Sequence, residues 1–268
     1  MPRFTIETVD DPRIREYRDL PRKKASRSAG HFVAEGRWLV RRLLQSEVEI
    51  VSILCIEKYV EEFAEVAEPV PLYLAERSLV EQIVGFEFHR GVLACGRRPR
   101  ALTLANLSVG ERRRALYAAC VGVCDPENLG GVIRNCAAFG ADALLVDRHC
   151  ADPFSRRVLR VSMGAALSLP IVESADLKQD LARLRNDGNF EITSAVLRES
   201  ACPLEETRPS EKAAIVFGNE GYGLSEEWLQ LCDHQVTLPM QGGVDSLNVA
   251  VASGIFLHHF ARMQRSLD

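Results

Sequence analysis

The sequence predicts an α/β protein with two domains. Predicted strands alternate with predicted helices along the chain, and the strands of the second half are almost continuously apolar. Such strands are typical of a parallel sheet that is buried on both faces. An arginine-rich segment, residues 97–114, interrupts the alternation, and 268 residues suffice for two compact domains. We therefore predict a first domain over 1–98, a linker over 99–114 and a second domain over 115–268.

The elements of the first domain follow from hydrophobic spacing. Residues 30–45 carry apolar side chains at helical intervals with arginines opposite, which predicts an amphipathic helix. Short apolar runs then predict buried strands, separated by segments of helical period. In chain order these are strand 50–56, helix 58–67, strand 70–75, helix 76–85 and strand 91–96. The series predicts a small α/β domain.

The second domain repeats this alternation with longer apolar runs. Its predicted strands are 115–124, 142–147, 190–197, 213–220 and 234–240, with a helix over 129–139. The last predicted helix, 246–263, is apolar on most sides, so we expect it to pack against the protein along much of its length.

Charge is distributed unevenly. The net charge is −4, yet residues 1–42 hold eleven Lys and Arg against six Asp and Glu, whereas residues 43–90 hold three against ten. A second basic cluster, with six arginines, lies in the segment 97–114. These basic segments are either solvated surface or contacts for nucleic-acid phosphates, and the sequence leaves both interpretations open.

Targeting segments and metal-binding patterns are absent from the sequence. No apolar run follows the N-terminal residues, so we expect neither a secretory signal nor a membrane span, and a cytoplasmic location. The eight cysteines are scattered without CxxC pairs, and we interpret them as reduced, buried, small hydrophobic residues and expect no metal.

Polar residues and glycines gather where three of the predicted strands end, which is where open α/β sheets bind ligands. In the first loop, 125–142, Asn128 and Gly130 permit a tight turn before a helix that carries Arg134. An arginine there can bind a phosphate or a carboxylate. The alternative interpretation is a capped helix with a surface arginine.

The second and third loops also allow two interpretations. Loop 215–229 has three glycines and Glu220 after a strand, but it lacks the dinucleotide and phosphate-loop patterns, and it could be a turn capped by Glu220. Loop 238–255 contains Ser246 and Asn248 among small and apolar residues, so an adenine or a thioether could lie there. In the plainer interpretation Ser246 is the N-cap of the last helix.

Together these segments resemble the SpoU (TrmH-like) RNA ribose methyltransferases. The resemblance lies in four blocks in the same order, N-x-G-x-x-x-R from Asn128 to Arg134, SMGAALSLP at 162–170, FGNEGYGL at 217–224 and LPM…DSLNVAVA at 238–252. Residues 31–44 and 89–94 resemble the family's substrate-binding domain, which is shaped like a small ribosomal RNA-binding protein. Arg90 stands where relatives commonly have glutamine, and Asp245 where many have glutamate.

The resemblance implies a SPOUT catalytic domain with a deep trefoil knot, whose loops bind S-adenosylmethionine, and a homodimer in which each site borrows residues from its neighbour. It implies methyl transfer to a ribose 2′-hydroxyl of structured RNA, without a metal. Because a separate N-terminal domain suits recognition of folded RNA, ribosomal RNA is favoured over transfer RNA.

The resemblance also assigns roles to residues. Arg134 is the catalytic residue. Because a guanidinium stays protonated in proteins, we favour electrostatic stabilisation by Arg134 rather than proton abstraction. Asn128 is expected to orient Arg134. Ser246 and Asn248 orient the loop, and Glu220 either accepts a hydrogen bond or acts in catalysis. The expected donor-binding residues are Gly218, Asn219, Gly221, Leu238, Met240, Ser246, Leu247 and Asn248. The expected RNA contacts are Arg37, Arg90, Arg156, Arg157 and Arg160.

The sequence leaves two alternative functions open. A family member that binds RNA without catalysis is the main alternative, although the presence of Arg134, Glu220, Ser246 and Asn248 argues against it. A base-methylating enzyme of the same knotted superfamily is the second. A nicotinamide dehydrogenase is excluded because its glycine fingerprint and ribose-binding acid are missing.

Overall fold

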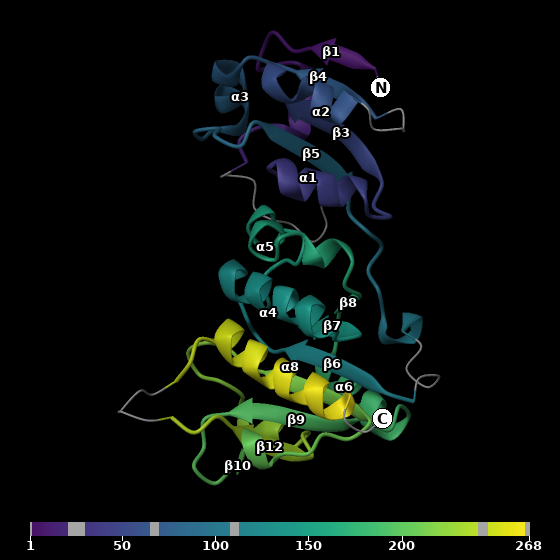
Figure 1. Ribbon diagram of the computed structural model, residues 1–268, viewed down its shortest axis with the longest axis vertical. Coiled ribbons are helices and arrows are strands. Elements are labelled where there is room, and N and C mark those ends of the chain that lie inside the picture. The colour runs from purple at the N-terminus through teal and green to yellow at the C-terminus, as the bar shows by residue number, and fades with distance from the viewer. Residues whose placement is uncertain (1, 21–29, 65–69, 108–112, 241–245, 266–268) are drawn as a thin grey trace. The chain divides into compact units, whose positions relative to one another are not determined.

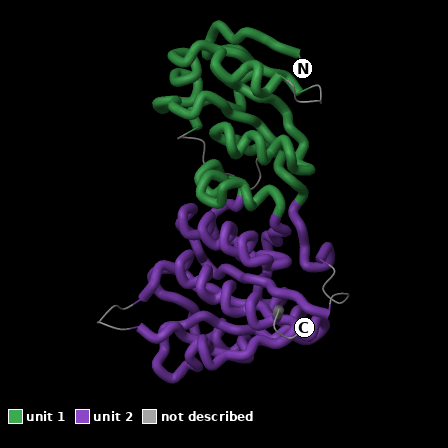
Figure 2. Tube along the Cα trace, in the orientation of Figure 1, with its two compact units in different colours: residues 1–100, 154–168 green, residues 101–153, 169–268 purple. Residues whose placement is uncertain are grey.

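The computed structural model describes residues 2–20, 30–64, 70–107, 113–240 and 246–265. It divides the chain into two compact units (Figure 2). Unit 1 consists of Met1–Arg100 and Phe154–Ser168, and unit 2 consists of Ala101–Pro153 and Leu169–Asp268. The domain limits that we drew from the sequence stay a prediction.

Unit 1 contains a mixed five-stranded sheet with the order β1-β4-β3-β5-β2. Its strands are β1 (Arg3–Thr5), β2 (His31–Glu35), β3 (Ile50–Cys55), β4 (Leu72–Leu74) and β5 (Val92–Arg97). The helices of this unit are α1 (Arg37–Leu44), α2 (Val60–Ala64), α3 (Arg77–Val84) and α5 (Arg156–Val161). At its core the fully buried Tyr17 hydroxyl donates to the Ser52 carbonyl at 2.9 Å and accepts from the Cys95 amide at 3.1 Å. The buried phenol is thereby satisfied.

The helix predicted over residues 30–45 is partly wrong. Its first part is the strand β2, which pairs with β5 in antiparallel register, and only Arg37–Leu44 is helical. Gly36 separates the two with a φ of +97°, a conformation that side-chain-bearing residues rarely adopt. The helical spacing was correct for α1 but was extended too far towards the N-terminus. The helix predicted over 58–67 is α2 preceded by the 3₁₀ turn Glu57–Tyr59; residues 65–67 lie outside the described residues.

Unit 2 is built on a seven-stranded sheet, and every strand pair in it is parallel, as predicted. The strand order is β10-β12-β9-β11-β6-β7-β8. The strands are β6 (Ala115–Cys120), β7 (Ala143–Val146), β8 (Ile171–Glu173), β9 (Glu191–Val196), β10 (Cys202–Pro203), β11 (Lys212–Phe217) and β12 (His234–Thr237). The helices are α4 (Pro126–Phe139), α6 (Leu177–Asn186), α7 (Glu226–Leu229) and α8 (Val249–Arg265).

Helices cover both faces of this sheet. Leu181 and Leu184 of α6 share a buried cluster with alternate residues of the central strands. On the other face Phe256 of α8 contacts Phe217 of β11 edge-on, with ring centroids 6.0 Å apart. Helices α4 and α8 lie side by side (Figure 1), and Gly131 lets them approach so closely that a Cβ there would meet Ala250 Cβ at 2.6 Å. The result is a three-layer α/β unit, as the continuous apolar strands predicted.

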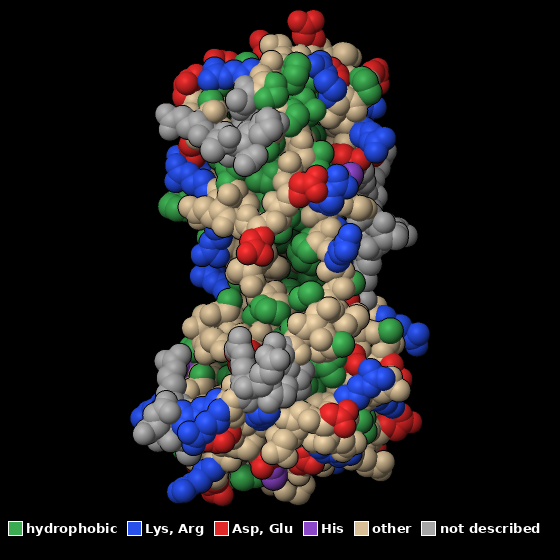
Figure 3. Space-filling view, turned by 90° about the vertical axis from the view of Figure 1, so that its right-hand side faces the viewer, with side chains coloured by type: hydrophobic (Ala, Val, Ile, Leu, Met, Phe, Trp, Pro, Cys, Tyr) green, Lys and Arg blue, Asp and Glu red, His purple; other side chains and the backbone are tan. Residues whose placement is uncertain are grey.

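No helix in the described part of the chain is long and apolar enough to cross a lipid bilayer. On the face shown in Figure 3, Lys and Arg side chains are interspersed with Asp and Glu side chains. The predicted trefoil knot stays a prediction.

Candidate active site

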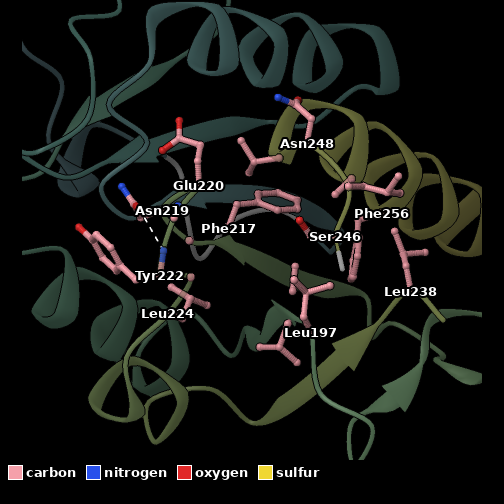
Figure 4. Close-up of a pocket in the computed structure, with 18 of the residues that line it drawn as sticks. Leu197, Phe217, Asn219, Glu220, Tyr222, Leu224, Leu238, Ser246, Asn248 and Phe256 are labelled. Atoms are coloured by element: carbon pink, nitrogen blue, oxygen red, sulfur yellow. Dashed lines mark hydrogen bonds between the residues drawn. The ribbon is translucent and has the colours of Figure 1, made fainter. Parts of the chain in front are cut away.

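A pocket of about 680 Å³ opens at the carboxyl end of the parallel sheet of unit 2. Because β9, β11 and β12 run in the same direction, the loops that follow them meet there, together with the first residues of α4 and α8. In Figure 4, Glu220 and Asn248 lie along one rim, and Leu197 and Leu224 lie along the opposite one. The expected residues that line this pocket are Asn128, Gly218, Asn219, Glu220, Gly221, Leu238, Met240, Ser246, Leu247 and Asn248. The sequence therefore predicted which loops converge.

The glycine loop after β11 is held in a fixed shape by its own backbone and by Asn219. A Cβ at Gly218 would lie 2.6 Å from the backbone carbon of Gly223, so only glycine fits at this close approach. The Asn219 amide donates to the Gly122 carbonyl at 2.7 Å, and its oxygen accepts from the Gly221 amide at 2.8 Å. The loop can thus present backbone groups to a ligand.

Helix α4 begins at the edge of the pocket, and its start is defined by an N-cap residue followed by a proline. Asp125 is the N-cap, and its carboxylate accepts from the Glu127 amide at 2.7 Å, with Pro126 in the first helical position. A cap of this kind contributes about 1 kcal/mol to helix stability. It places Asn128 in the first turn of α4, beside the glycine loop.

Asn128 connects the other two loops. Its Nδ2 donates to Glu220 Oε1 at 2.9 Å, and its Oδ1 accepts from Asn248 Nδ2 at 2.7 Å. Glu220 Oε1 also lies 3.4 Å from the Asp125 amide. One amide side chain therefore fixes the relative positions of three segments that are far apart in the sequence.

Asn248, and not Ser246, caps α8. The helix begins at Val249, and Asn248 Oδ1 accepts from the Ala250 amide at 2.9 Å. Ser246 lines the pocket two residues earlier and points into it in Figure 4. The plainer interpretation of Ser246 as the N-cap is wrong, because the helix starts later than we predicted. Asp245 lies outside the described residues.

Arg134 does not line the pocket. It is exposed on α4 and forms no hydrogen bond or ion pair within the described part of the chain. The expected contact with Asn128 is not made. The two residues are six positions apart on one helix, which places their side chains about 120° apart around its axis. Asn128 faces the glycine loop, whereas Arg134 faces outward.

The lining of the pocket suits a ligand with both polar and apolar parts. Leu238, Met240 and Leu247 provide apolar surface beside the glycine backbone and the Asn128 network. An aromatic base and a thioether chain can pack on such surface while backbone groups bind polar atoms, and the volume lies in the range usual for small-molecule sites. The residues present thus fit a nucleoside bearing a thioether or sulfonium.

Sequence reasoning missed the contribution of β9. Residues 195–198, which are the last two residues of this strand and the exposed Leu197 and Arg198 after it, line the pocket. The sequence did allow this prediction, because a parallel strand in the same sheet as β11 has its carboxyl end at the same edge of that sheet. Tyr222, 79% exposed at the rim, stood in the glycine motif without an assigned role.

The arginines expected to contact RNA lie in unit 1, mostly in ion pairs. Arg37 pairs with Glu62 at 2.8 Å. Arg90 and Arg156 pair with the two oxygens of Glu35 at 3.3 Å and 3.0 Å. Arg160 lies 4.0 Å from the same carboxylate, and Arg157 is exposed in the first turn of α5. Pairing orients these side chains and leaves further N–H donors of each guanidinium for a ligand.

The cysteines are free thiols, but not all of them are buried. Cys124 and Cys202 are exposed and Cys232 is half-buried, which corrects the expectation for these three. Burial raises the pKa of the Cys136 thiol to about 12 and that of Cys120 well above its ordinary value. Cys124 Sγ lies 4.0 Å from Glu220 Oε2, at the edge of the pocket.

Comparison with protein families matches both halves of the chain. Residues 115–258 match the SpoU rRNA Methylase family, and residues 11–94 match the MRM3-like substrate binding domain. The first match contains the loops that form the pocket.

Relatives match this chain over most of their own length. An uncharacterised tRNA/rRNA methyltransferase of Mycobacterium bovis is 34% identical over 262 residues, which cover 94% of this chain and 90% of the relative. A 23S rRNA (guanosine-2′-O-)-methyltransferase of Acinetobacter baylyi is 31% identical, over 84% of this chain and 94% of the relative. The crystal structure of an AdoMet-bound rRNA methyltransferase from Sinorhizobium meliloti is similar with a TM-score of 0.84 at 26% identity, covering 99% of both chains.

Proposed function

Since the chain belongs to the SpoU rRNA methylase family, we propose that it transfers the methyl group of S-adenosylmethionine to a ribose 2′-hydroxyl of ribosomal RNA. The observation that carries this proposal is the convergence of the three motif loops on one pocket, where Asn128 joins Glu220 to Asn248. The naming of relatives as 23S rRNA 2′-O-methyltransferases supports the choice of ribosomal RNA.

The loops of the pocket hold the methyl donor in this proposal. When bound, S-adenosylmethionine supplies a methyl group activated by a positively charged sulfur. The backbone at Gly218 and Leu238 binds its polar atoms, and Leu247 and Met240 pack against its apolar parts. In the transfer the ribose oxygen would bond to the methyl carbon while the carbon–sulfur bond breaks, which would leave the neutral thioether S-adenosylhomocysteine, and the hydroxyl proton would pass to water. The protein contributes chiefly by aligning the two reactants.

We assign the catalytic role to Arg134. As a fixed cation it stabilises negative charge that develops on the ribose oxygen and holds the adjoining phosphate. Glu220, Asn128, Ser246 and Asn248 act as positioning residues, because their mutual contacts fix the loops around the donor.

A homodimer would explain why Arg134 is exposed and lies outside the pocket of its own chain. Val251 and Ile255 are 53% and 40% exposed, one helical turn apart on α8, and offer an apolar stripe for a second copy. We propose that each subunit provides Arg134 to the pocket of its neighbour. Sedimentation velocity of the purified chain tests the dimer, and a monomer that is fully active would overturn this arrangement.

The target and the cellular location follow from the same proposal. An enzyme of ribosomal RNA is expected in the cytoplasm. Mapping 2′-O-methylation in total RNA from cells with and without the gene should reveal a lost ribosomal site. A lost transfer RNA site would correct the substrate, and a methylated base would instead indicate the base-modifying branch of the superfamily. Normal donor binding by calorimetry without methyl transfer to any RNA would favour a binding protein.

A further inference from the structure

Unit 1 contains a polar cavity of its own, of about 250 Å³. It lies between the start of α1, Tyr59, His89 with Arg90, and the segment that holds Arg160. All of these residues belong to unit 1, so the cavity is distinct from the pocket of unit 2.

A buried carboxylate organises the positive charge at this cavity. Glu35 is 5% exposed, and three guanidinium groups, those of Arg90, Arg156 and Arg160, lie within 4.0 Å of its oxygens. Arg156 is further tied by the Phe86 ring, whose centroid is 4.4 Å from its guanidinium carbon. One negative charge thus faces three positive ones, and Arg90 keeps about half of its side chain exposed. The excess charge favours an anionic ligand.

An exposed aromatic side chain stands beside this charge. Trp38 lines the cavity and is 71% exposed, although α1 buries Leu39, Val40 and Leu43 on its other face. The guanidinium of Arg41 lies 5.6 Å from the indole centroid. Exposure of a large apolar ring to water is unfavourable. Nucleic-acid bases stack on flat aromatic faces of this kind that are flanked by cations.

We propose that this cavity binds one unpaired nucleotide of the substrate RNA, with its base stacked on Trp38 and its phosphate bound by Arg90 and Arg160. The inference rests on the proposed function, because it specifies a feature of the same substrate. A volume of about 250 Å³ accepts a single base and excludes a duplex. In duplex RNA the bases are stacked inside the helix, so only a looped or bulged nucleotide can enter.

The two tryptophans of the chain, Trp38 and Trp228, make a direct test possible. In full-length Trp228→Phe protein, Trp38 is the only indole, and its emission reports on the cavity. We expect a short single-stranded oligoadenylate to quench this emission. A blunt RNA duplex of equal length should leave it nearly unchanged. Equal quenching by the duplex, or by an acidic peptide, would overturn the proposal.

Affinity measurements separate stacking from charge. By anisotropy of a labelled oligoadenylate, Trp38→Ala should bind roughly tenfold more weakly, whereas Trp38→Phe should retain most of the affinity. Arg90→Gln should also weaken binding more than Arg77→Gln, a charge-matched change on the exposed surface of α3. If Trp38→Ala binds like the wild type, or if both arginine variants lose the same affinity, the cavity does not bind a nucleotide.

The outcome is separable from that of the proposed function. Methylation of ribosomal RNA by the Trp228→Phe protein, together with a Trp38 emission that is insensitive to oligoadenylate, would refute only the nucleotide cavity. Quenching by oligoadenylate without methyl transfer to ribosomal RNA would refute only the proposed function.

Discussion

Asn128 and Asn248, 120 residues apart, are joined by a hydrogen bond of 2.7 Å from the Asn248 amide to the Asn128 oxygen. The Asn128 amide in turn donates to Glu220 at 2.9 Å. Because an asparagine amide both donates and accepts, Asn128 can join a carboxylate on one side to an amide on the other. This relationship ties the glycine loop to the start of α8 across the donor pocket.

Replacing Asn128 should therefore affect catalysis more than folding. We expect Asn128→Ala to lower kcat for methyl transfer roughly 100-fold, because loops that drift by about 1 Å misalign the reactants. Asn128→Asp should be at least as damaging, since a second carboxylate would face Glu220. Steady-state kinetics with ribosomal RNA measure the effect. Asn186→Ala, at the exposed end of α6, is the matched control, and equal losses in both variants would contradict the linking role.

Arg134 should be needed for methyl transfer but not for donor binding. It lies outside the pocket of its own chain, so Arg134→Ala should bind S-adenosylmethionine in calorimetry with nearly normal affinity. Its kcat should fall by about 100-fold to 1000-fold, as when a group that stabilises transition-state charge is removed. Arg134→Lys should recover part of the rate with an unchanged pH profile. A wild-type rate with a shifted acidic limb would indicate proton abstraction instead.

Two glycines of the same loop should respond differently to alanine. At Gly218 a Cβ would meet Gly223 backbone at 2.6 Å, so Gly218→Ala should cost roughly 1–3 kcal/mol of stability and abolish most donor binding. At Gly221 the nearest atom, Asn219 Oδ1, is 3.4 Å away, and Gly221→Ala should change stability by less than about 1 kcal/mol. Urea unfolding and calorimetry test both variants. Similar costs at the two positions would show that the loop can move apart at Gly218.

Cys124 should report occupancy of the pocket. Its thiol is exposed and lies 4.0 Å from Glu220 Oε2, whereas Cys202 is exposed elsewhere on unit 2. We expect iodoacetamide to alkylate both residues, and S-adenosylhomocysteine to slow the reaction at Cys124 only. Peptide mass spectrometry over time gives the two rates. Equal slowing at both cysteines, or at neither, would place the bound nucleoside away from Glu220.

Buried thiols should make the protein sensitive to alkali. Desolvation raises the pKa of Cys136 from 9.0 to about 12, so the unfolded chain ionises first. The contribution of this thiol to stability is complete below pH 9 and is lost as the pH rises towards 12, with a slope of at most about 1.4 kcal/mol per pH unit. Cys136→Ala should flatten the decline measured by urea unfolding between pH 9 and 11. An unchanged slope would mean that other groups control it.

The sequence by itself determined the parallel sheet of unit 2 and the loops that form the pocket. Continuous apolar strands such as β6 and β11 are stable only when both faces are covered, and the carboxyl ends of parallel strands meet at one edge. Motif residues after β11 and β12 therefore had to come together. Because neighbouring β9 ends at that edge as well, its contribution was predictable in principle.

Only the tertiary structure decided which side chains meet. Residues His31–Glu35 form a strand because β5 offers a backbone partner, which outweighs a helical hydrophobic spacing. Asn128 contacts Glu220 and Asn248 because α4 turns that face towards the loops and turns Arg134 away from them. Glu35 likewise pairs with arginines from two segments that are far apart in the sequence, because packing brings these segments together. Local sequence determines the hydrophobic periodicity of a helix or strand. Which side chains meet over long sequence distances depends on how remote segments pack together.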